Sequence, residues 1–224
     1  MNKFIKIFIV ITFFICRLHT LAQVNDAGAW MSINIEKSIF SDLSATFTEE
    51  LRLNENCTEA GTILSDLGLA YKINKNIKIS ANYRFSNKRR LDDSYNNRHR
   101  YYFDIILKEK MKPIVFSVRS RFQSQYTDYN SSPDGRMPAN YIREKATIKI
   151  DLDKKYTPYF YTEVYFRLNN VQYEQFNRIR YSGGFEYSFN RLHTIDIFYL
   201  IQKEYNKPNP RTDYIMGIGY FLYL

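Results

Sequence analysis

The chain has 224 residues, with 32 Lys and Arg against 23 Asp and Glu, a formal charge of +9 and a mean hydropathy of −0.45. This length is enough for one β-barrel or for one to two ordinary domains. The low hydropathy excludes a bundle of membrane-spanning helices. It is compatible with a membrane β-barrel, because lipid-facing and lumen-facing residues alternate along each strand.

The first 22 residues resemble a secretory signal peptide. Lys3 and Lys6 precede the apolar run IFIVITFFI at 7–15, and the small-residue sequence TLA at 20–22 follows it. The apolar run is too short for a spanning helix. We therefore predict a signal peptide at 1–22 and a single domain at 23–224.

Cleavage after Ala22 removes three basic residues and lowers the formal charge to about +6. The mature chain then keeps one cysteine, Cys57, so it has no partner for an intramolecular disulfide. A lipoprotein signal would use Cys16, but Ile15 before it is a poor fit to the small residue expected there.

After the predicted signal peptide, apolar and polar residues alternate along almost the whole chain. In IKISANYRF at 77–85, the odd positions are apolar or aromatic and the even positions are polar. This period of two predicts a β-strand with one apolar face. The same pattern predicts strands at 29–37, 43–54, 62–73, 76–86, 97–109, 113–126, 140–151, 157–168, 177–189, 193–203 and 212–224.

Most of these segments have ten to thirteen residues. Globular strands usually have about five or six, whereas a tilted strand that crosses a membrane needs about 9–11. We therefore predict an all-β fold, a single antiparallel up-and-down transmembrane β-barrel of about 10–12 strands. The alternative is a soluble secreted sandwich, which would normally have shorter strands and more Gly and Pro in its turns.

The connections after the first hairpin alternate between short and long, as expected for periplasmic turns and outside loops. On that assignment the last strand runs inward, and so does the segment at 29–37. Because single-chain bacterial barrels have even strand counts, we expect either ten strands with 29–37 as an extra element, or twelve.

The polar faces carry many charged residues, which we expect to point into the lumen because arginine facing lipid costs about 2–4 kcal/mol. The predicted lumen network consists of Glu50, Arg52, Arg84, Arg98, Arg100, Asp104, Arg119, Arg121, Glu163, Arg167, Arg178, Arg180 and Glu186, with Asp66, Lys78, Arg143, Lys145 and Asp213 on the same faces. Because arginine and carboxylate pairs can brace such an interior, our first interpretation is a narrow or occluded pore, or a structural surface protein, with a charge-paired lumen. Bases outnumber acids, so an anion-attracting lumen is a second interpretation, and a specific binding or catalytic site is a third.

Several short motifs occur in an order that resembles the domain-of-unknown-function family 2490. They are Trp30, EELR at 49–52, YRF at 83–85, RHRYYFD at 98–104, RSRFQ at 119–123, YTEVYF at 161–166 and RIRYSGGFEY at 178–187. The resemblance covers nearly all of the mature chain. It implies an outer-membrane β-barrel of uncharacterised role and transfers no catalytic residue.

A lipid-modifying barrel enzyme would need a nucleophile beside a histidine. After the signal peptide there are two histidines, His99 and His193, and neither has a serine two residues further on. Ser120 and Ser182 are the candidate nucleophiles from other strands. We interpret His99 as an interfacial residue and His193 as a turn residue, and we leave the enzyme hypothesis open but less favoured.

No His and Cys cluster is present, so we predict no metal and no cofactor. The acidic segment DYNSSPDG at 128–135 lacks the spacing of a helix-flanked calcium loop. As partners we expect outer-membrane lipid, lipopolysaccharide near NKRR at 87–90 and possible small anionic solutes. Export argues against nucleic acid, and the oligomeric state stays open.

Overall fold

The computed structural model describes residues 24–90, 92–127, 137–152, 155–169, 175–207 and 209–224. Predictions on the signal peptide at 1–22 and the acidic segment at 128–135 lie outside these residues. The strands are β1 (Val24–Ser38), β2 (Leu43–Asn54), β3 (Glu59–Lys72), β4 (Ile77–Arg89), β5 (Tyr95–Met111), β6 (Ile114–Thr127), β7 (Ala139–Ile150), β8 (Tyr156–Arg167), β9 (Phe176–Ser188), β10 (His193–Glu204) and β11 (Arg211–Tyr223).

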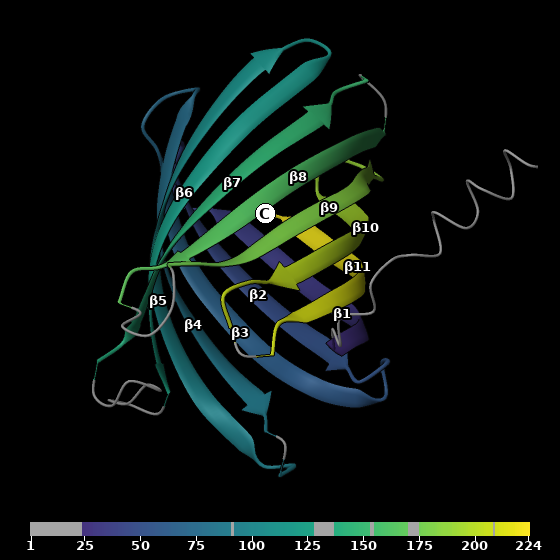
Figure 1. Cartoon of the computed structure of the whole chain (residues 1–224). Helices are drawn as coiled ribbons and strands as arrows, with labels where there is room; N and C mark the ends of the chain where they lie inside the picture. Colours follow the sequence, from purple (N-terminus) through teal and green to yellow (C-terminus); the bar gives the residue numbers. More distant parts are fainter. Residues whose placement is uncertain (1–23, 91, 128–136, 153–154, 170–174, 208) are drawn as a thin grey trace, which may run out of the picture.

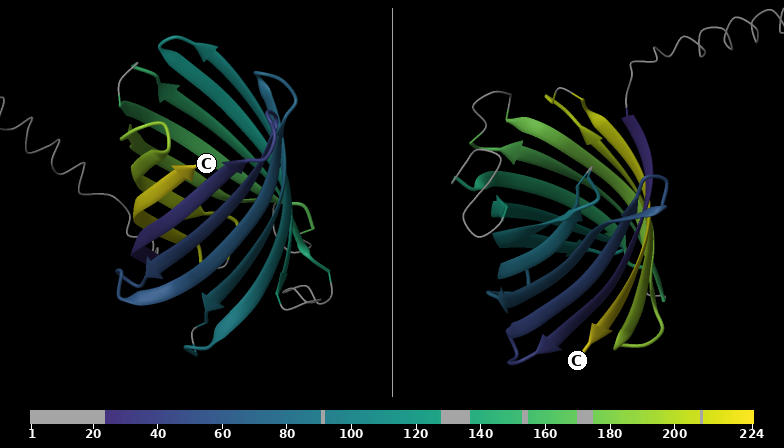
Figure 2. Two further views of the ribbon diagram at one scale, coloured as in Figure 1. Left: turned by 180° about the vertical axis from the view of Figure 1, so that it is seen from behind. Right: turned by 90° about the horizontal axis from the view of Figure 1, so that it is seen from below.

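These strands form one closed barrel, with each strand hydrogen-bonded to its two neighbours in the order β1-β11-β10-β9-β8-β7-β6-β5-β4-β3-β2 (Figure 1). Closure leaves no free sheet edge in the described barrel. Figure 2 shows the strands tilted around a common interior, seen from behind and from below. Within the described residues, no helix is long and apolar enough to cross a membrane.

The expectation of an even strand count with all neighbours antiparallel is wrong at one seam. β1 pairs with β11 in parallel, from Val24 beside Arg211 to Glu36 beside Tyr223, whereas every other neighbouring pair is antiparallel. The physical reason is geometric: in a closed up-and-down barrel with an odd number of strands, two neighbours must run in the same direction. The segment at 29–37 is therefore a full barrel strand.

The two ends of the barrel differ in their connections. At one end, which we call the turn end, the strands are joined by 39–42, 73–76, 112–113, 151–155 and 189–192. The C-terminus lies there too, because the Leu224 amide donates to the Glu36 carbonyl. The opposite loop end carries the connections 55–58, 90–94, 128–138, 168–175 and 205–210, and both β1 and β11 begin there.

The alternation of side chains assigns one face of each strand to the outside. Large apolar residues on that face are strongly exposed, among them Leu67 at 56 % and Met216 at 62 %. The other face contains buried charged residues such as Asp66, Arg121 and Glu163. An exposed apolar wall around a polar interior is the arrangement of a barrel that lies in lipid.

Candidate functional site: an arginine-rich lumen

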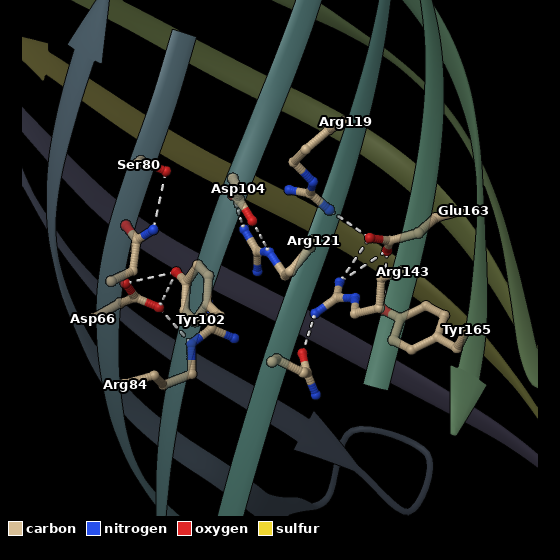
Figure 3. Close-up of polar contacts among 12 residues, drawn as sticks. Asp66, Ser80, Arg84, Tyr102, Asp104, Arg119, Arg121, Arg143, Glu163 and Tyr165 are labelled. Carbon is tan, nitrogen blue, oxygen red and sulfur yellow. Dashed lines mark hydrogen bonds and ion pairs between the residues drawn. The ribbon is translucent and has the colours of Figure 1, made fainter. Parts of the chain in front are cut away.

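The interior charges lie in contacts that cross several strands. On the β3–β6 side, the Asp66 carboxylate accepts from Arg84 Nε at 2.6 Å and from the Tyr102 hydroxyl at 2.7 and 2.8 Å (Figure 3). Arg121 donates twice to Asp104, at 2.6 Å for each bond, and its guanidinium lies 3.8 Å from the centre of the Tyr102 ring. Bidentate pairs of this kind hold the arginine plane in one orientation.

A second cluster surrounds one carboxylate, Glu163 of β8, which is only 2 % exposed. It accepts from Arg143 at 2.8 and 3.0 Å, and from Arg119 (Figure 3), while Arg180 lies 3.6 Å away. The Tyr165 hydroxyl donates to it at 2.9 Å. One buried negative charge is therefore shared by three guanidinium groups from β6, β7 and β9.

The single Trp of the chain also lies on the inner face. The Arg52 guanidinium is 4.0 Å from the centre of the Trp30 ring, and Arg180 is 5.2 Å from it. Arg52 in turn donates to Glu50 at 2.6 Å. Cation–π contacts of this kind hold arginine side chains against the wall without neutralising their charge.

A cavity of about 640 Å³ lies between these clusters and the loop end. Its lining contains fourteen Arg and Lys residues but four Asp and Glu residues. The basic residues are Arg52, Arg84, Lys88, Arg98, Arg100, Arg119, Arg121, Arg143, Lys145, Arg167, Arg178, Arg180, Lys207 and Arg211, and the acidic ones are Asp26, Glu163, Glu204 and Asp213. The cavity wall is therefore strongly positive.

At the loop end, the neighbouring basic residues affect the ionisation of Lys207. Burial and the nearby charge of Arg178 lower the pKa of the Lys207 ammonium. Its contact with Glu204, at 2.6 Å, opposes that shift. The Glu204 carboxylate also accepts from Arg178 at 2.9 Å, so two cations share one acid at this rim.

The structure places ten of the thirteen residues of the predicted lumen network in the cavity wall. They are Arg52, Arg84, Arg98, Arg100, Arg119, Arg121, Glu163, Arg167, Arg178 and Arg180. Of the other three, Glu50 and Asp104 pair with cavity arginines, whereas Glu186 lies near the turn end and pairs with Lys149 at 2.5 Å.

Sequence reasoning missed four inner residues that shape the cavity or its clusters: Trp30, Tyr102, Tyr165 and Asp26. A signal for the two tyrosines was present, because Tyr102 has the same parity as Arg100 and Asp104, and Tyr165 lies between Glu163 and Arg167 on one face. Asp26 precedes the first segment that the alternation predicted. It accepts from the Glu55 and Asn56 amides, whose residues have positive φ angles of 52° and 57°.

The two histidines lie on the outer face. His99 is 5 % exposed, and its Nδ1 is 2.7 Å from the Tyr83 hydroxyl. His193 Nδ1 is 2.6 Å from the Tyr220 hydroxyl. The candidate nucleophiles are engaged elsewhere in the described part of the chain: Ser182 donates to the Tyr199 carbonyl, and Ser120 to Glu144.

Glu144 is an outer-face residue that the apolar pattern did not predict. It lies on β7 opposite Ser120 of β6 and Val164 of β8, with the apolar Ile142 and Ala146 before and after it on the same face. Its Oε2 accepts from the Ser120 hydroxyl at 2.7 Å. Among the described residues, no group of three or more His, Cys, Asp and Glu side chains is arranged to hold a metal ion.

Comparisons with known proteins agree with this geometry. The chain belongs to the family described as "Protein of unknown function (DUF2490)", whose model matches residues 27–213. A comparison with curated protein sequences finds no match. The family thus confirms the resemblance and leaves the activity to be argued from the site.

Two solved structures share the fold. One, titled "NanC porin structure in rhombohedral crystal form", is 13 % identical with a TM-score of 0.50, covering 79 % of this chain and 86 % of that one. The other, titled "Bacterial polysaccharide outer membrane secretin", is 9 % identical with a TM-score of 0.51, covering 79 % of this chain and 63 % of that one. At these identities the likeness concerns the fold alone, which is that of outer-membrane β-barrels.

Proposed function

We propose that the protein is an outer-membrane β-barrel whose lumen is a narrow, anion-attracting pore. The observation that carries the proposal is the cavity wall, in which fourteen basic residues face four acidic ones. A cavity lined by one sign of charge between low-dielectric walls raises the local concentration of counter-ions. Small anions are therefore the solutes that this interior attracts.

The bracing clusters support a pore that stays narrow. Barrels of eight strands are just filled by their side chains, whereas barrels of 16–18 strands leave an aqueous channel. Eleven strands lie between these cases. The buried groups around Asp66 and Glu163 hold their arginines against the wall, so the free cross-section is set by fixed guanidinium groups.

The membrane placement rests on the outer face and on the predicted export signal. The exposed apolar wall and strands of 12–17 residues fit a lipid bilayer, which a tilted strand crosses in about 9–11 residues. The signal peptide predicted at 1–22 would direct export. We assign the loop end to the cell exterior, because outer-membrane barrels have longer outside loops.

The rim next to β4 supports a further contact with lipopolysaccharide. Arg90 is exposed at the loop end, beside Arg89, which pairs with Glu55, Glu59 and Asp93. A cation at the outer rim would attract the anionic groups of lipopolysaccharide. This contact is separate from the lumen and does not depend on its conductance.

The test is single-channel recording in planar lipid bilayers, with protein first shown to be folded by its heat-shifted gel mobility. We expect discrete, anion-selective steps, and weaker selectivity after Arg119→Gln, which removes a cavity charge but leaves Arg143 and Arg180 on Glu163. The control is Lys75→Gln, an exposed residue of the turn end. Folded protein that never conducts would overturn the pore and favour a barrel closed by its own charge pairs.

A further inference from the structure

One wall of the cavity carries three cations on two adjacent strands. Lys88 of β4 and Arg98 and Arg100 of β5 all point inward, and the register places Arg98 opposite Ser86 and Arg100 opposite Arg84. Lys88 lies one inward position further toward the loop end than Ser86. The three side chains, which we call the β4–β5 cation wall, therefore line one strip of the cavity mouth.

No carboxylate among the described residues pairs with any of the three. Arg100 donates from Nε and Nη2 to the neutral Gln125 Oε1, at 3.2 and 2.6 Å. Arg98 Nε is buried and has no hydrogen-bond partner in the described part of the chain. The neighbouring Arg84, by contrast, is held by Asp66 at 2.6 Å.

On the opposite side of the mouth, the bases are matched by acids. Lys88 lies within electrostatic range of Arg98, and also of Arg178, Arg211 and the Glu204 carboxylate across the lumen. Arg178 shares Glu204 with Lys207, whereas Arg211 is neutralised locally by Asp26 and Asp213 at 2.7 and 2.5 Å. At the cavity mouth, the unpaired charge is therefore concentrated on the β4–β5 cation wall.

Cations held together without an acid repel one another, and a partly buried charge without a partner is unfavourable. A bound anion removes both penalties, and an oxyanion offers several acceptors to guanidinium donors. The cavity volume of about 640 Å³ falls in the range of about 300–1,000 Å³ typical of small-molecule sites. The space thus suits a small solute rather than a polymer coil.

From this we infer that Lys88, Arg98 and Arg100 form a binding subsite for a small oxygen-bearing dianion: hydrogen phosphate, sulfate or a dicarboxylate. The inference rests on the proposed function, because it names the class of solute that the anion-attracting lumen holds. Two or three adjacent cations favour a dianion over a monoanion, because each further charge pair adds its own attraction. The subsite is a holding point at the mouth of the cavity.

The test is calorimetric titration of the folded, detergent-solubilised chain at low ionic strength, where charge contacts are least screened. The probes are inorganic phosphate, sulfate and succinate, with chloride and acetate as monoanions. We expect each dianion to bind at least tenfold more tightly than acetate. Emission of Trp30, the single Trp and a cavity residue, gives a second readout.

The decisive variant is Arg98→Gln with Arg100→Gln, which should weaken dianion binding at least tenfold. Arg98→Lys with Arg100→Lys keeps the charge but loses the planar fork, and should give an intermediate loss. The matched control, Lys75→Gln with Arg191→Gln, removes two exposed charges at the turn end and should bind as the unaltered chain does. Heat-shifted mobility verifies that each variant is folded.

The binding and conductance experiments together distinguish failure of the proposed subsite from failure of the proposed pore. Dianion binding that depends on Arg98 and Arg100, in a barrel that does not conduct, would keep the subsite and overturn the pore. Anion conductance in a barrel that binds none of the three dianions more tightly than acetate would keep the pore and overturn the subsite. Tight dianion binding that survives the double Gln variant would also overturn it. Phosphate or sulfate binding without succinate binding would narrow the ligand to tetrahedral oxyanions and still support it.

Discussion

The two halves of the lumen are built from the same alternating pattern but have different interiors. Toward the turn end, several inner-face groups pair with one another: Lys149 with Glu186 at 2.5 Å, Lys78 with Glu36 at 3.3 Å, and the Tyr159 hydroxyl with Asp196 at 2.9 and 3.1 Å. Toward the loop end, the cavity wall has an excess of bases.

Packing differs between the halves as well as charge. The Phe198 ring of β10 lies against the backbone of Gly217 on β11, and a Cβ atom at position 217 would overlap it. Phe198 is not part of the cavity lining at the loop end. The comparison teaches that an inward strand face does not by itself define a channel. What distinguishes the halves is the balance of bases and acids on the inner face, which is strongly basic in the cavity wall at the loop end.

The largest effect is expected where the charges are most deeply paired. Glu163→Gln leaves Arg119, Arg143 and Arg180 around a neutral amide, and breaking such a buried cluster costs about 3–5 kcal/mol. Urea unfolding of the barrel in lipid vesicles measures the loss. Glu55→Gln, at an exposed carboxylate of the loop end that pairs with Arg89 at 3.4 Å, is the matched control and should cost about 0–1 kcal/mol. Equal losses of unfolding free energy in the two variants would contradict the view that buried ion pairs stabilise the centre of the lumen more than the loop end.

Removal of the ring tests whether the turn-end half restricts the lumen. Phe198→Ala opens space beside Gly217 and should raise single-channel conductance severalfold, while the missing ring contacts destabilise the barrel by about 3 kcal/mol or less, because water can enter the gap. Phe160→Ala removes the same ring from the outer face and should leave conductance unchanged. Unaltered conductance in the Phe198 variant would place the narrowest point elsewhere.

The outer wall offers a carboxylate in the opposite environment to Glu163. Glu144 faces outward, so replacing it with Leu, together with Ser120→Ala, should stabilise the barrel in lipid. The gain should be below the roughly 2–4 kcal/mol that Arg or Lys costs at the bilayer midplane, since acids cost less there. Unfolding in lipid vesicles measures it. A destabilised double variant would show that the polar pair has a partner on the outside.

The smallest effect concerns the rim lysine. Because the pKa of Lys207 is lowered in the folded chain, the unfolded chain binds more protons between that lowered value and the ordinary value near 10.4. Stability should therefore rise slightly with pH across that window, and Lys207→Gln should flatten the rise. Unfolding midpoints measured at several pH values decide this. If stability rises equally with pH in the Lys207→Gln variant, groups other than Lys207 cause the rise.

Much of the fold could be predicted from the sequence. Each of the eleven predicted segments overlaps one observed strand, because period two is a local property that survives in the closed barrel. The parallel seam could not be predicted, since β1 and β11 are far apart in the chain and their pairing depends on closure of all the strands between them.

The partners within the lumen were beyond sequence reasoning for a related reason. Tyr102 of β5 reaches Asp66 of β3 across the intervening β4, and Glu163 gathers cations from three strands. Strand tilt and side-chain length decide such contacts, and neither is visible in the spacing of residues. The sequence showed that bases exceed acids. The structure shows that the excess is concentrated at one end.

The central claim is that the loop-end half of the lumen attracts anions, and the most direct test is the reversal potential of the folded chain in a planar bilayer under a KCl gradient. The account predicts a potential of the sign that chloride selectivity produces, shrinking toward zero in the Arg98→Gln, Arg100→Gln variant. A potential of the opposite sign, or one near zero for the unaltered chain, would contradict it.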